Sequence, residues 1–269
     1  MKLPRTLLVL FFTMAALAGS SGLAETITSA RFEAPVDRYG HFALGRPHEY
    51  ARLTATTDGG RRLLLELPEN EVFEDRQPRL LRLAAGEPAE ILAIVSRRDS
   101  GSRLVMIRLH ADRLEIGAQS APIGTPMRWL NPLGAADLDG DGRAEIAAVT
   151  TPHLGGTLRV YRRQGGELVE IAALTGFSNH LYGSSELGLA TTMAIAGRLH
   201  LLVPDATRRR LRIVALKGDR LVETGSCALS APVTGAVRPV SPSVVSVELL
   251  AGQQLIDLDT CGSGASAAQ

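Results

Sequence analysis

Short apolar segments recur along this chain at an interval of about 55 residues, and this repeat limits the fold more than any other feature. Gly142, Gly197 and Gly252 are 55 residues apart, and each precedes a short apolar run. One interval earlier, residues 89–91 (Ala-Glu-Ile) occupy the place of residues 144–146, which have the same sequence. A repeat of this size is typical of propellers and solenoids. Because the apolar runs are short and regularly spaced, they favour strands and therefore a propeller.

The second half of each repeat has the pattern of a β-hairpin. In three successive repeats an apolar segment, a tight turn and a second apolar segment follow one another, and their leading leucines are ten residues apart: Leu104 and Leu114, Leu158 and Leu168, Leu211 and Leu221. This spacing is that of two strands joined by a short turn. Together with the first half, each repeat supplies four strands, which is the content of one propeller blade.

The repeats predict an all-β chain folded as a β-propeller of five four-stranded blades, with four blades as the alternative. The first blade is the most divergent, and its expected strands are residues 40–44, 49–56, 62–67 and 72–74. The last blade contains two expected strands, 244–250 and 254–258. Because an open sheet edge exposes unpaired backbone groups, we expect the N-terminal residues 26–32 to complete this blade and close the ring.

One repeat contains an acidic loop that is suited to a hard cation. Asp137, Asp139, Asp141 and Glu145 stand at the first, third, fifth and ninth positions of the loop, and the carbonyl of Arg143 lies between them. Carboxylate and carbonyl oxygens on a tight turn are the ligands that Ca²⁺ prefers. The loop therefore predicts one structural calcium ion. A metal-free hairpin built on Asx turns is the alternative.

The surroundings of the acidic loop exclude an EF-hand. An EF-hand needs Glu at the twelfth loop position and a helix on each side, whereas this chain has Ala148 there and short apolar flanks. A strand, this loop and a second strand resemble the calcium hairpin of FG-GAP repeats in integrin α-subunits and in bacterial VCBS-repeat proteins. The resemblance covers about residues 131–176 and implies a calcium-binding propeller. The preceding repeat keeps only the last carboxylate, Glu90, and the following repeat has none, so one ion is expected rather than several.

The N-terminus indicates export. Residues 1–24 combine a basic start, an apolar run too short to span a bilayer and a small-residue ending, which is the pattern of a cleaved signal peptide. No cysteine lies near the cleavage site, which argues against a lipid anchor, and no second membrane span is expected. We expect a propeller domain over residues 25–262, a disordered tail over 263–269, and a periplasmic or secreted protein.

Charge and cysteine content set further limits. Residues 25–269 carry 27 basic and 28 acidic side chains, so no bulk attraction to nucleic acid or anionic lipid is expected. Cys227 and Cys261 are the only cysteines. In an oxidising compartment an even number of cysteines predicts a disulfide, and two free thiols are the alternative.

Polar and aromatic residues gather on the loops opposite the acidic loop. Because strands alternate in direction, the connections that carry residues 128–131, 151–156 and 176–182 share one side of the molecule. Loops on a rigid scaffold are where ligand sites usually occur. The candidate ligand-binding residues are Arg128, Trp129, Asn131, His153, Asn179 and His180. Turn formation and packing between blades are the alternative roles for these residues.

No sequence fingerprint of a known catalytic class is present, since the chain has no Gly-x-Ser-x-Gly, His-Glu-x-x-His, P-loop or dinucleotide-binding pattern. The first hypothesis is therefore a non-enzymatic module that binds an unidentified protein or extracellular ligand, with calcium acting only on structure. The second is a periplasmic hydrolase that uses the loops carrying His153 and His180. The third is a structural module of a larger envelope assembly.

Overall fold

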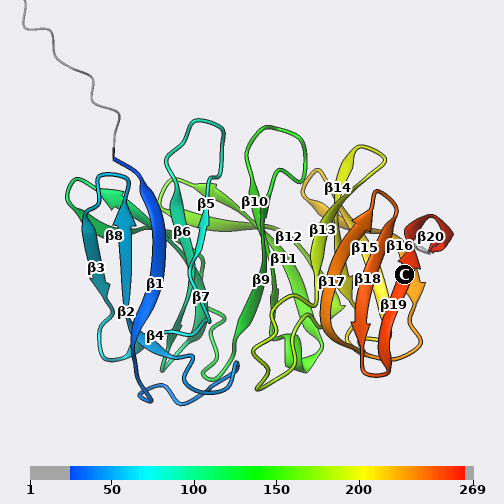
Figure 1. The fold of residues 1–269 in the computed structure, drawn as a ribbon, viewed down its shortest axis with the longest axis horizontal. Helices are drawn as coiled ribbons and strands as arrows, with labels where there is room; N and C mark the ends of the chain where they lie inside the picture. Colours follow the sequence, from blue (N-terminus) through cyan, green and yellow to red (C-terminus); the bar gives the residue numbers. More distant parts are fainter. Residues whose placement is uncertain (1–24, 264–269) are drawn as a thin grey trace, which may run out of the picture.

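The computed structural model describes residues 25–263, and this part of the chain is all-β, with two short 3₁₀ helices and no α-helix. The predicted signal peptide and most of the predicted tail lie outside the described residues. Figure 1 shows groups of strands standing side by side along the longest axis, from the N-terminal strands at one end to the C-terminal strands at the other. The all-β prediction is confirmed.

Three sheets contain the described strands, and the largest has twelve. Its N-terminal half consists of β1 (Ile27–Pro35), β2 (Tyr50–Thr57), β3 (Arg62–Glu66), β4 (Glu71–Phe73), β5 (Arg79–Leu81), β6 (Glu90–Arg97), β7 (Gly101–His110) and β8 (Arg113–Gln119). Its second half consists of β9 (Leu130–Ala136), β10 (Glu145–Thr150), β11 (Gly156–Gln164) and β12 (Glu167–Phe177). The two halves are joined by a single parallel pairing of Glu167 in β12 with Gln119 in β8.

The C-terminal third of the chain forms two smaller sheets. The five-stranded sheet contains β13 (Thr191–Ile195), β14 (Arg198–Pro204), β15 (Arg210–Lys217), β16 (Arg220–Ala228) and β20 (Gly262–Ser263). The three-stranded sheet contains β17 (Val233–Ser241), β18 (Val244–Leu249) and β19 (Gly252–Asp257). The 3₁₀ helices are η1 (Pro152–Leu154) and η2 (Leu258–Thr260).

The core lies between successive groups of strands. Four buried clusters join β1–β4 to β5–β8, β5–β8 to β9–β12, β9–β12 to β13–β16, and β13–β16 to β17–β19. The middle strands are therefore covered on both sides, and all six residues of β10 are buried. This explains why β10 has a continuous apolar run instead of an alternating one.

The prediction of how the array closes is wrong. Residues 27–35 form β1, which pairs antiparallel with β2 and completes the first group of strands instead of the last. Residues 40–44, expected as a strand, lie in the loop between β1 and β2. The third strand of the last sheet is β17, which the sequence analysis missed. Pro239 interrupts the apolar pattern of β17, and it is tolerated because β17 pairs on one side only.

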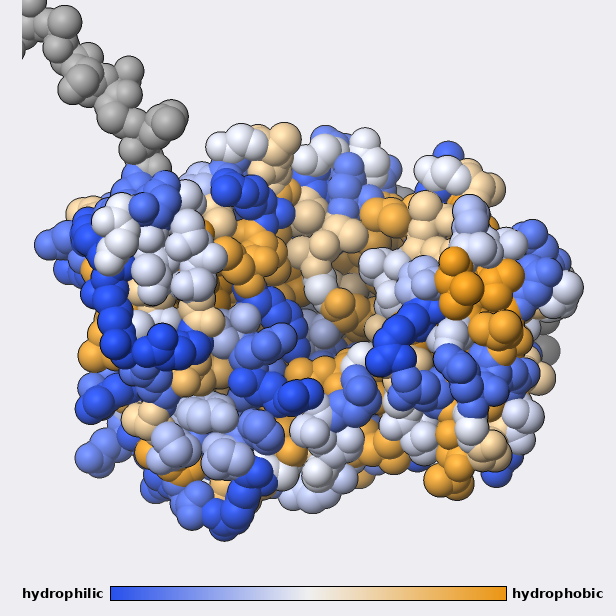
Figure 2. All heavy atoms as spheres, viewed as in Figure 1, coloured by the Kyte–Doolittle hydropathy of each residue, from blue (hydrophilic) through white to orange (hydrophobic). Residues whose placement is uncertain are grey.

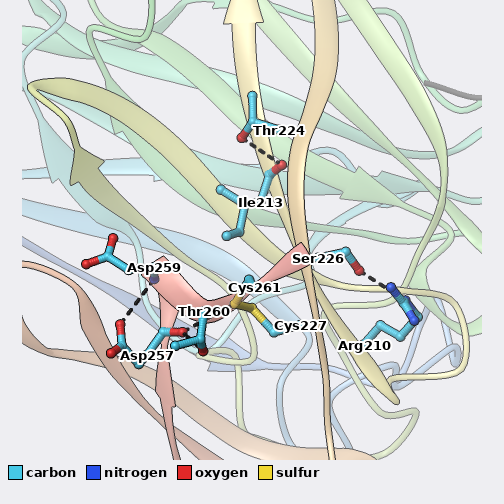
Figure 3. Close-up of a disulfide and its surroundings, with 9 residues drawn as sticks. All are labelled: Arg210, Ile213, Thr224, Ser226, Cys227, Asp257, Asp259, Thr260 and Cys261. Atoms are coloured by element: carbon cyan, nitrogen blue, oxygen red, sulfur yellow. Dashed lines mark hydrogen bonds between the residues drawn. A yellow bond between two sulfur atoms is a disulfide. The ribbon is translucent and has the colours of Figure 1, made fainter. Parts of the chain in front are cut away.

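A disulfide ties the last two sheets together. Cys227 near the end of β16 is bonded to Cys261, which follows η2 (Figure 3). The next residues form β20 and pair with β16, so the chain returns to the five-stranded sheet. The predicted disulfide is confirmed, and its presence indicates an oxidising compartment.

The surface of this array is mixed in polarity. In the view of Figure 2 it is largely hydrophilic, with a hydrophobic patch over the C-terminal sheets. Val240, Leu250 and Leu255 are large apolar side chains of this region that are more than half exposed.

Candidate functional site

A cavity of about 160 Å³ opens among the loops opposite the acidic loop. Its polar lining includes His41, Arg128, Thr151, His153 and Tyr182. These residues belong to four connections: β1 to β2, β8 to β9, β10 to β11, and β12 to β13. The cavity is therefore built from loops that lie far apart in the sequence.

The first notable pair at this cavity is His41 and Glu74. The Nδ1 atom of His41 lies 2.8 Å from Oε1 of Glu74, and the Glu74 side chain is fully buried. Because a carboxylate can only accept here, Nδ1 carries the proton and donates it. In the neutral ring Nε2 is then a lone-pair acceptor, and it has no partner among the described residues. A histidine oriented by a carboxylate in this way has the geometry of a general base.

Glu74 is fixed by several further bonds. Its side chain accepts hydrogen bonds from the backbone N–H of Ala43 at 3.2 Å and from Oγ of Ser96 at 2.6 Å. Its backbone carbonyl accepts a bond from Nε1 of Trp129 at 2.9 Å. Ser96 also contacts Ser102 at 2.6 Å, and both serines are buried. These bonds compensate the cost of burying the carboxylate.

A second pair, His153 and His180, lies beside the first. Nε2 of His153 lies 2.7 Å from Nδ1 of His180, and Nε2 of His180 lies 2.9 Å from the carbonyl of Ser184. The carbonyl requires a proton on Nε2 of His180, so Nδ1 of His180 accepts a hydrogen bond from Nε2–H of His153. Burial lowers the pKa of His153 to about 3, and the nearby Arg208 and the neighbouring imidazoles act in the same direction.

Both rings of this pair are neutral at pH 7. Burial lowers the pKa of His180 to about 4, and the bond to the Ser184 carbonyl opposes this shift only in part. With its proton on Nε2, His153 keeps a lone pair on Nδ1, and Nδ1 has no partner among the described residues. His153 can therefore accept a hydrogen bond from a water or a substrate in the cavity.

Aromatic rings hold the two pairs in place. The indole of Trp129 is parallel to the ring of His153, with centroids 6.1 Å apart. Tyr182 contacts one member of each pair. Its ring meets the ring of His153 edge-on, with centroids 5.4 Å apart, and its hydroxyl donates a hydrogen bond to the His41 carbonyl at 2.6 Å. Met127 and Leu154 complete the wall with apolar side chains.

The structure separates the predicted ligand-binding residues into two groups. Arg128, Trp129 and His153 line the cavity, with His180 directly behind His153. Asn131 and Asn179 do not line it. They are fully buried, and each donates its side-chain amide to the backbone carbonyl of the other at 3.1 Å, which joins the start of β9 to the segment after β12.

Sequence reasoning missed His41 and Glu74. Both residues fall within expected strands, 40–44 and 72–74, and neither is a predicted site residue, because nothing in the sequence relates two residues 33 positions apart. Tyr182 stands near His180 in the sequence but was not among the candidates. The sequence offered no local signal for any of these contacts, since each depends on how separate loops meet.

The acidic loop joins β9 to β10 at the opposite end of these strands, as predicted. Ligand atoms of Asp137, Asp139 and Glu145 lie within 4.8 Å of one another. The guanidinium of Arg162 bonds Asp139 at 2.5 Å and Glu145 at 2.9 Å. Burial raises the pKa of Glu145, although the N–H of Leu138 and Arg162 counteract this. These carboxylate oxygens fit a hard cation. Arg162 partly neutralises their negative charge. The bound calcium ion remains a prediction.

A larger hollow of about 720 Å³ lies between β8 and β11–β12. Its charged side chains include Arg159 and Glu170, which form an ion pair with each other. Arg159 also donates to Thr150 at 3.0 Å. This hollow contains no histidine or cysteine among its lining residues, so the smaller cavity is the better candidate for chemistry.

Among residues 25–263, no helix has the length and apolar character needed to cross a membrane. The signal peptide that the sequence predicts lies outside these residues.

Comparisons with known proteins find matches among solved structures alone. No protein-family model and no curated protein matches the chain. Solved structures do match, including a crystal structure from Bacteroides fragilis described as a "putative 6-phosphogluconolactonase". It is 15% identical to this chain with a TM-score of 0.40, and the match covers 81% of this chain and 68% of that one.

This comparison corrects the first functional hypothesis. The expected non-enzymatic binding module is not retained, since the matching structure carries the name of an enzyme, a "putative 6-phosphogluconolactonase". At this distance the similarity assigns neither an activity nor a substrate to the chain. The argument for hydrolysis therefore depends on the chain's own residues.

Proposed function

We propose that this protein is a hydrolase whose active site is the cavity lined by His41, Arg128, His153 and Tyr182. The observation that carries the proposal is the His41–Glu74 pair. A buried carboxylate orients the imidazole, and the free Nε2 atom belongs to a ring that lines the cavity. This arrangement provides a general base in a confined site, which is what hydrolysis by water requires.

The cavity favours direct attack by water over a covalent intermediate. Neither serine nor cysteine lines it. Thr151 does, but its hydroxyl is hydrogen-bonded to no histidine among the described residues, so the wall offers no activated nucleophile. His41 takes a proton from a water molecule at Nε2 while the water oxygen attacks an ester or lactone carbonyl carbon. When the carbon–oxygen bond to the leaving group breaks, His41 returns the proton to the departing oxygen.

The other groups have supporting roles in this scheme. The imidazolium formed at His41 is stabilised by the negative charge of Glu74. The lone pair on Nδ1 of neutral His153 orients the attacking water, and His180 holds the tautomer that keeps this lone pair available. Tyr182 fixes the backbone of His41 through its hydroxyl.

The test uses purified protein with a panel of small esters and lactones, with hydrolysis followed by acid release. We expect turnover in the wild type and a loss of about 10²- to 10⁴-fold in His41→Gln, the usual contribution of a positioned base. His110→Gln is the matched control, since His110 is an exposed side chain at the turn between β7 and β8. Absence of turnover in the wild type, or full activity in His41→Gln, would refute the proposal.

For the fold, we propose that the five groups of strands are the blades of a five-bladed propeller of the FG-GAP type. The supporting observation is that each of the four core clusters joins groups adjacent in the sequence. The acidic loop binds one structural Ca²⁺ in this proposal, and the protein is exported to the periplasm or beyond. An experimental structure with added Ca²⁺ tests the blade count and the ion together.

A further inference from the structure

We infer that the substrate of this site carries an anionic group, a carboxylate or a phosphate, which the guanidinium of Arg128 binds. The inference rests on the proposed hydrolase function and adds the charge of the substrate to it. It depends on three observations: the charge balance of the cavity wall, the absence of a carboxylate partner for Arg128 in the described chain, and the way the backbone of Arg128 is held.

The wall of the cavity contains a cationic side chain and no acidic one. Arg128 lines it, whereas none of its lining residues is aspartate or glutamate. Two fully buried acids contact His41 from behind the wall, and both already have partners: Glu74 accepts bonds from His41, Ala43 and Ser96. Glu49 accepts the backbone N–H groups of residues 40–42. His153 is neutral at pH 7, so Arg128 is the charged group of the wall contributed by these two residues. A confined site of this composition attracts anions.

Arg128 differs from most arginines of the described chain. Sixteen of them pair with a carboxylate within 4.0 Å, for example Arg103 with Glu71 and Arg163 with Glu90. The side-chain bond formed by Arg128 goes from Nη1 to the carbonyl of Met127 at 2.9 Å, and no carboxylate of residues 25–263 pairs with it. Its remaining N–H groups can form the bidentate contact that suits a carboxylate or phosphate.

The backbone of Arg128 is held rigidly beside the cavity. Its carbonyl accepts two bonds from Ser102, one from the backbone N–H at 3.0 Å and one from Oγ at 2.9 Å. The chain packs so closely there that a Cβ on Gly101 would lie 3.0 Å from this carbonyl and 2.4 Å from that of Thr125. The next residue, Trp129, is fixed by its bond to Glu74. Such preorganisation lowers the cost of binding an ion.

The test measures anion binding directly, independently of catalysis. Inorganic phosphate and acetate are titrated separately into ¹⁵N-labelled protein at pH 7, and the side-chain signals of Arg128 and Trp129 are followed by NMR. We expect saturable shifts with at least one anion and about tenfold weaker binding in Arg128→Gln. Tighter binding of phosphate indicates a phosphate ligand, and tighter binding of acetate indicates a carboxylate ligand.

Two further variants keep the test decisive. Arg220→Gln removes an exposed arginine at the β15–β16 turn and is expected to leave binding unchanged. Arg128→Lys keeps the charge without the bidentate geometry, so intermediate binding is expected, and it replaces Arg128→Gln if that variant fails to fold. Absence of binding of both anions to the wild type, or equal affinity in the wild type and Arg128→Gln, would overturn the inference.

An activity arm separates this inference from the proposed function. With matched esters that differ only in a carboxylate on the acyl chain, Arg128→Gln should raise KM for the anionic ester by about tenfold more than KM for the neutral one. If the wild type hydrolyses neither ester but binds anions through Arg128, the hydrolase proposal fails while the anion site stands. If it hydrolyses both and Arg128→Gln lowers both rates equally, the hydrolase stands and the inference fails.

Discussion

His41 and Glu74 are 33 residues apart, and the structure places Nδ1 of His41 2.8 Å from Oε1 of Glu74. The carboxylate comes from the end of β4 and the imidazole from the loop between β1 and β2, so the pair exists only because β2 pairs with both β1 and β4. It is the one place in the described cavity where a buried acid orients a ring that faces a space large enough for a small ligand.

The carboxylate of Glu74 can be tested by its neutral isostere. Gln at this position keeps the shape but offers His41 one acceptor and one competing donor, so the ring loses its fixed tautomer. We expect kcat to fall about 10²-fold or more while the fold is retained. Glu66→Gln on β3, where the side chain is 52% exposed, is the control for the same change elsewhere. Unchanged kcat in Glu74→Gln would mean that the pair has no catalytic role.

The stability of the protein should depend on pH through His153 and His180. Both have a pKa lowered in the folded state, to about 3 and about 4, whereas the ordinary value is 6.5. Below pH 6.5 these two histidines are protonated in the unfolded chain but stay neutral in the folded chain. The free energy of unfolding therefore decreases progressively as the pH falls towards 4. Urea unfolding between pH 7.5 and 4.5 measures this loss.

A histidine variant identifies the source of that pH dependence. His153→Gln removes one of the two groups and should flatten the dependence of the unfolding free energy on pH. His110→Gln should not, because the His110 side chain is 59% exposed. Identical slopes for the wild type and His153→Gln would show that other groups are responsible.

Glu49 is expected to stabilise the loop that carries His41. Its carboxylate is fully buried and accepts the backbone N–H groups of Gly40, His41 and Phe42, each at 2.9 Å. Glu49→Gln leaves at least one of these buried donors without an acceptor, which costs about 1–3 kcal/mol. Thermal unfolding should show a lower Tm than in Glu69→Gln, a control at an exposed position. Equal melting temperatures would contradict this role.

Calcium should raise the melting temperature if the acidic loop binds it. Ligand binding to the folded state alone stabilises by RT ln(1 + [L]/Kd), so a chelator lowers Tm and added Ca²⁺ restores it. Asp139→Ala should abolish the response, while Asp112→Ala at the exposed β7–β8 turn should keep it. Since Arg162 already bonds Asp139 and Glu145, the absence of any calcium response would mean that this arginine neutralises the loop.

The disulfide should contribute measurably to stability. Cys227 and Cys261 close a loop with a sequence separation of 34, for which the chain-entropy model gives about 3–4 kcal/mol. Reduction, or the double change Cys227→Ser and Cys261→Ser, should lower the free energy of unfolding by this amount. Urea unfolding measures the loss as a lower midpoint concentration. An unchanged midpoint would show that the pairing of β20 with β16 is sufficient to hold the C-terminus.

The sequence predicted best what is local. The hairpins of β7–β8, β11–β12 and β15–β16 follow from apolar runs and tight turns, and all three are present. The acidic loop lies between two strands for the same reason: nine neighbouring residues determine its turn. His153, Trp129 and Arg128 were also placed correctly on one end of the array, since strand direction alternates along each repeat.

What the sequence determined by itself is therefore the strands, their turns, the paired cysteines and the end of the array on which the loops meet. Only the tertiary structure decided that β1 pairs with β2, that β17 completes the last sheet, and that His41 meets Glu74. Alternating side chains make a segment a strand but do not choose its partner, because any exposed edge offers the same backbone donors and acceptors. The choice is made by the burial of whole faces, and this is a property of the assembled core.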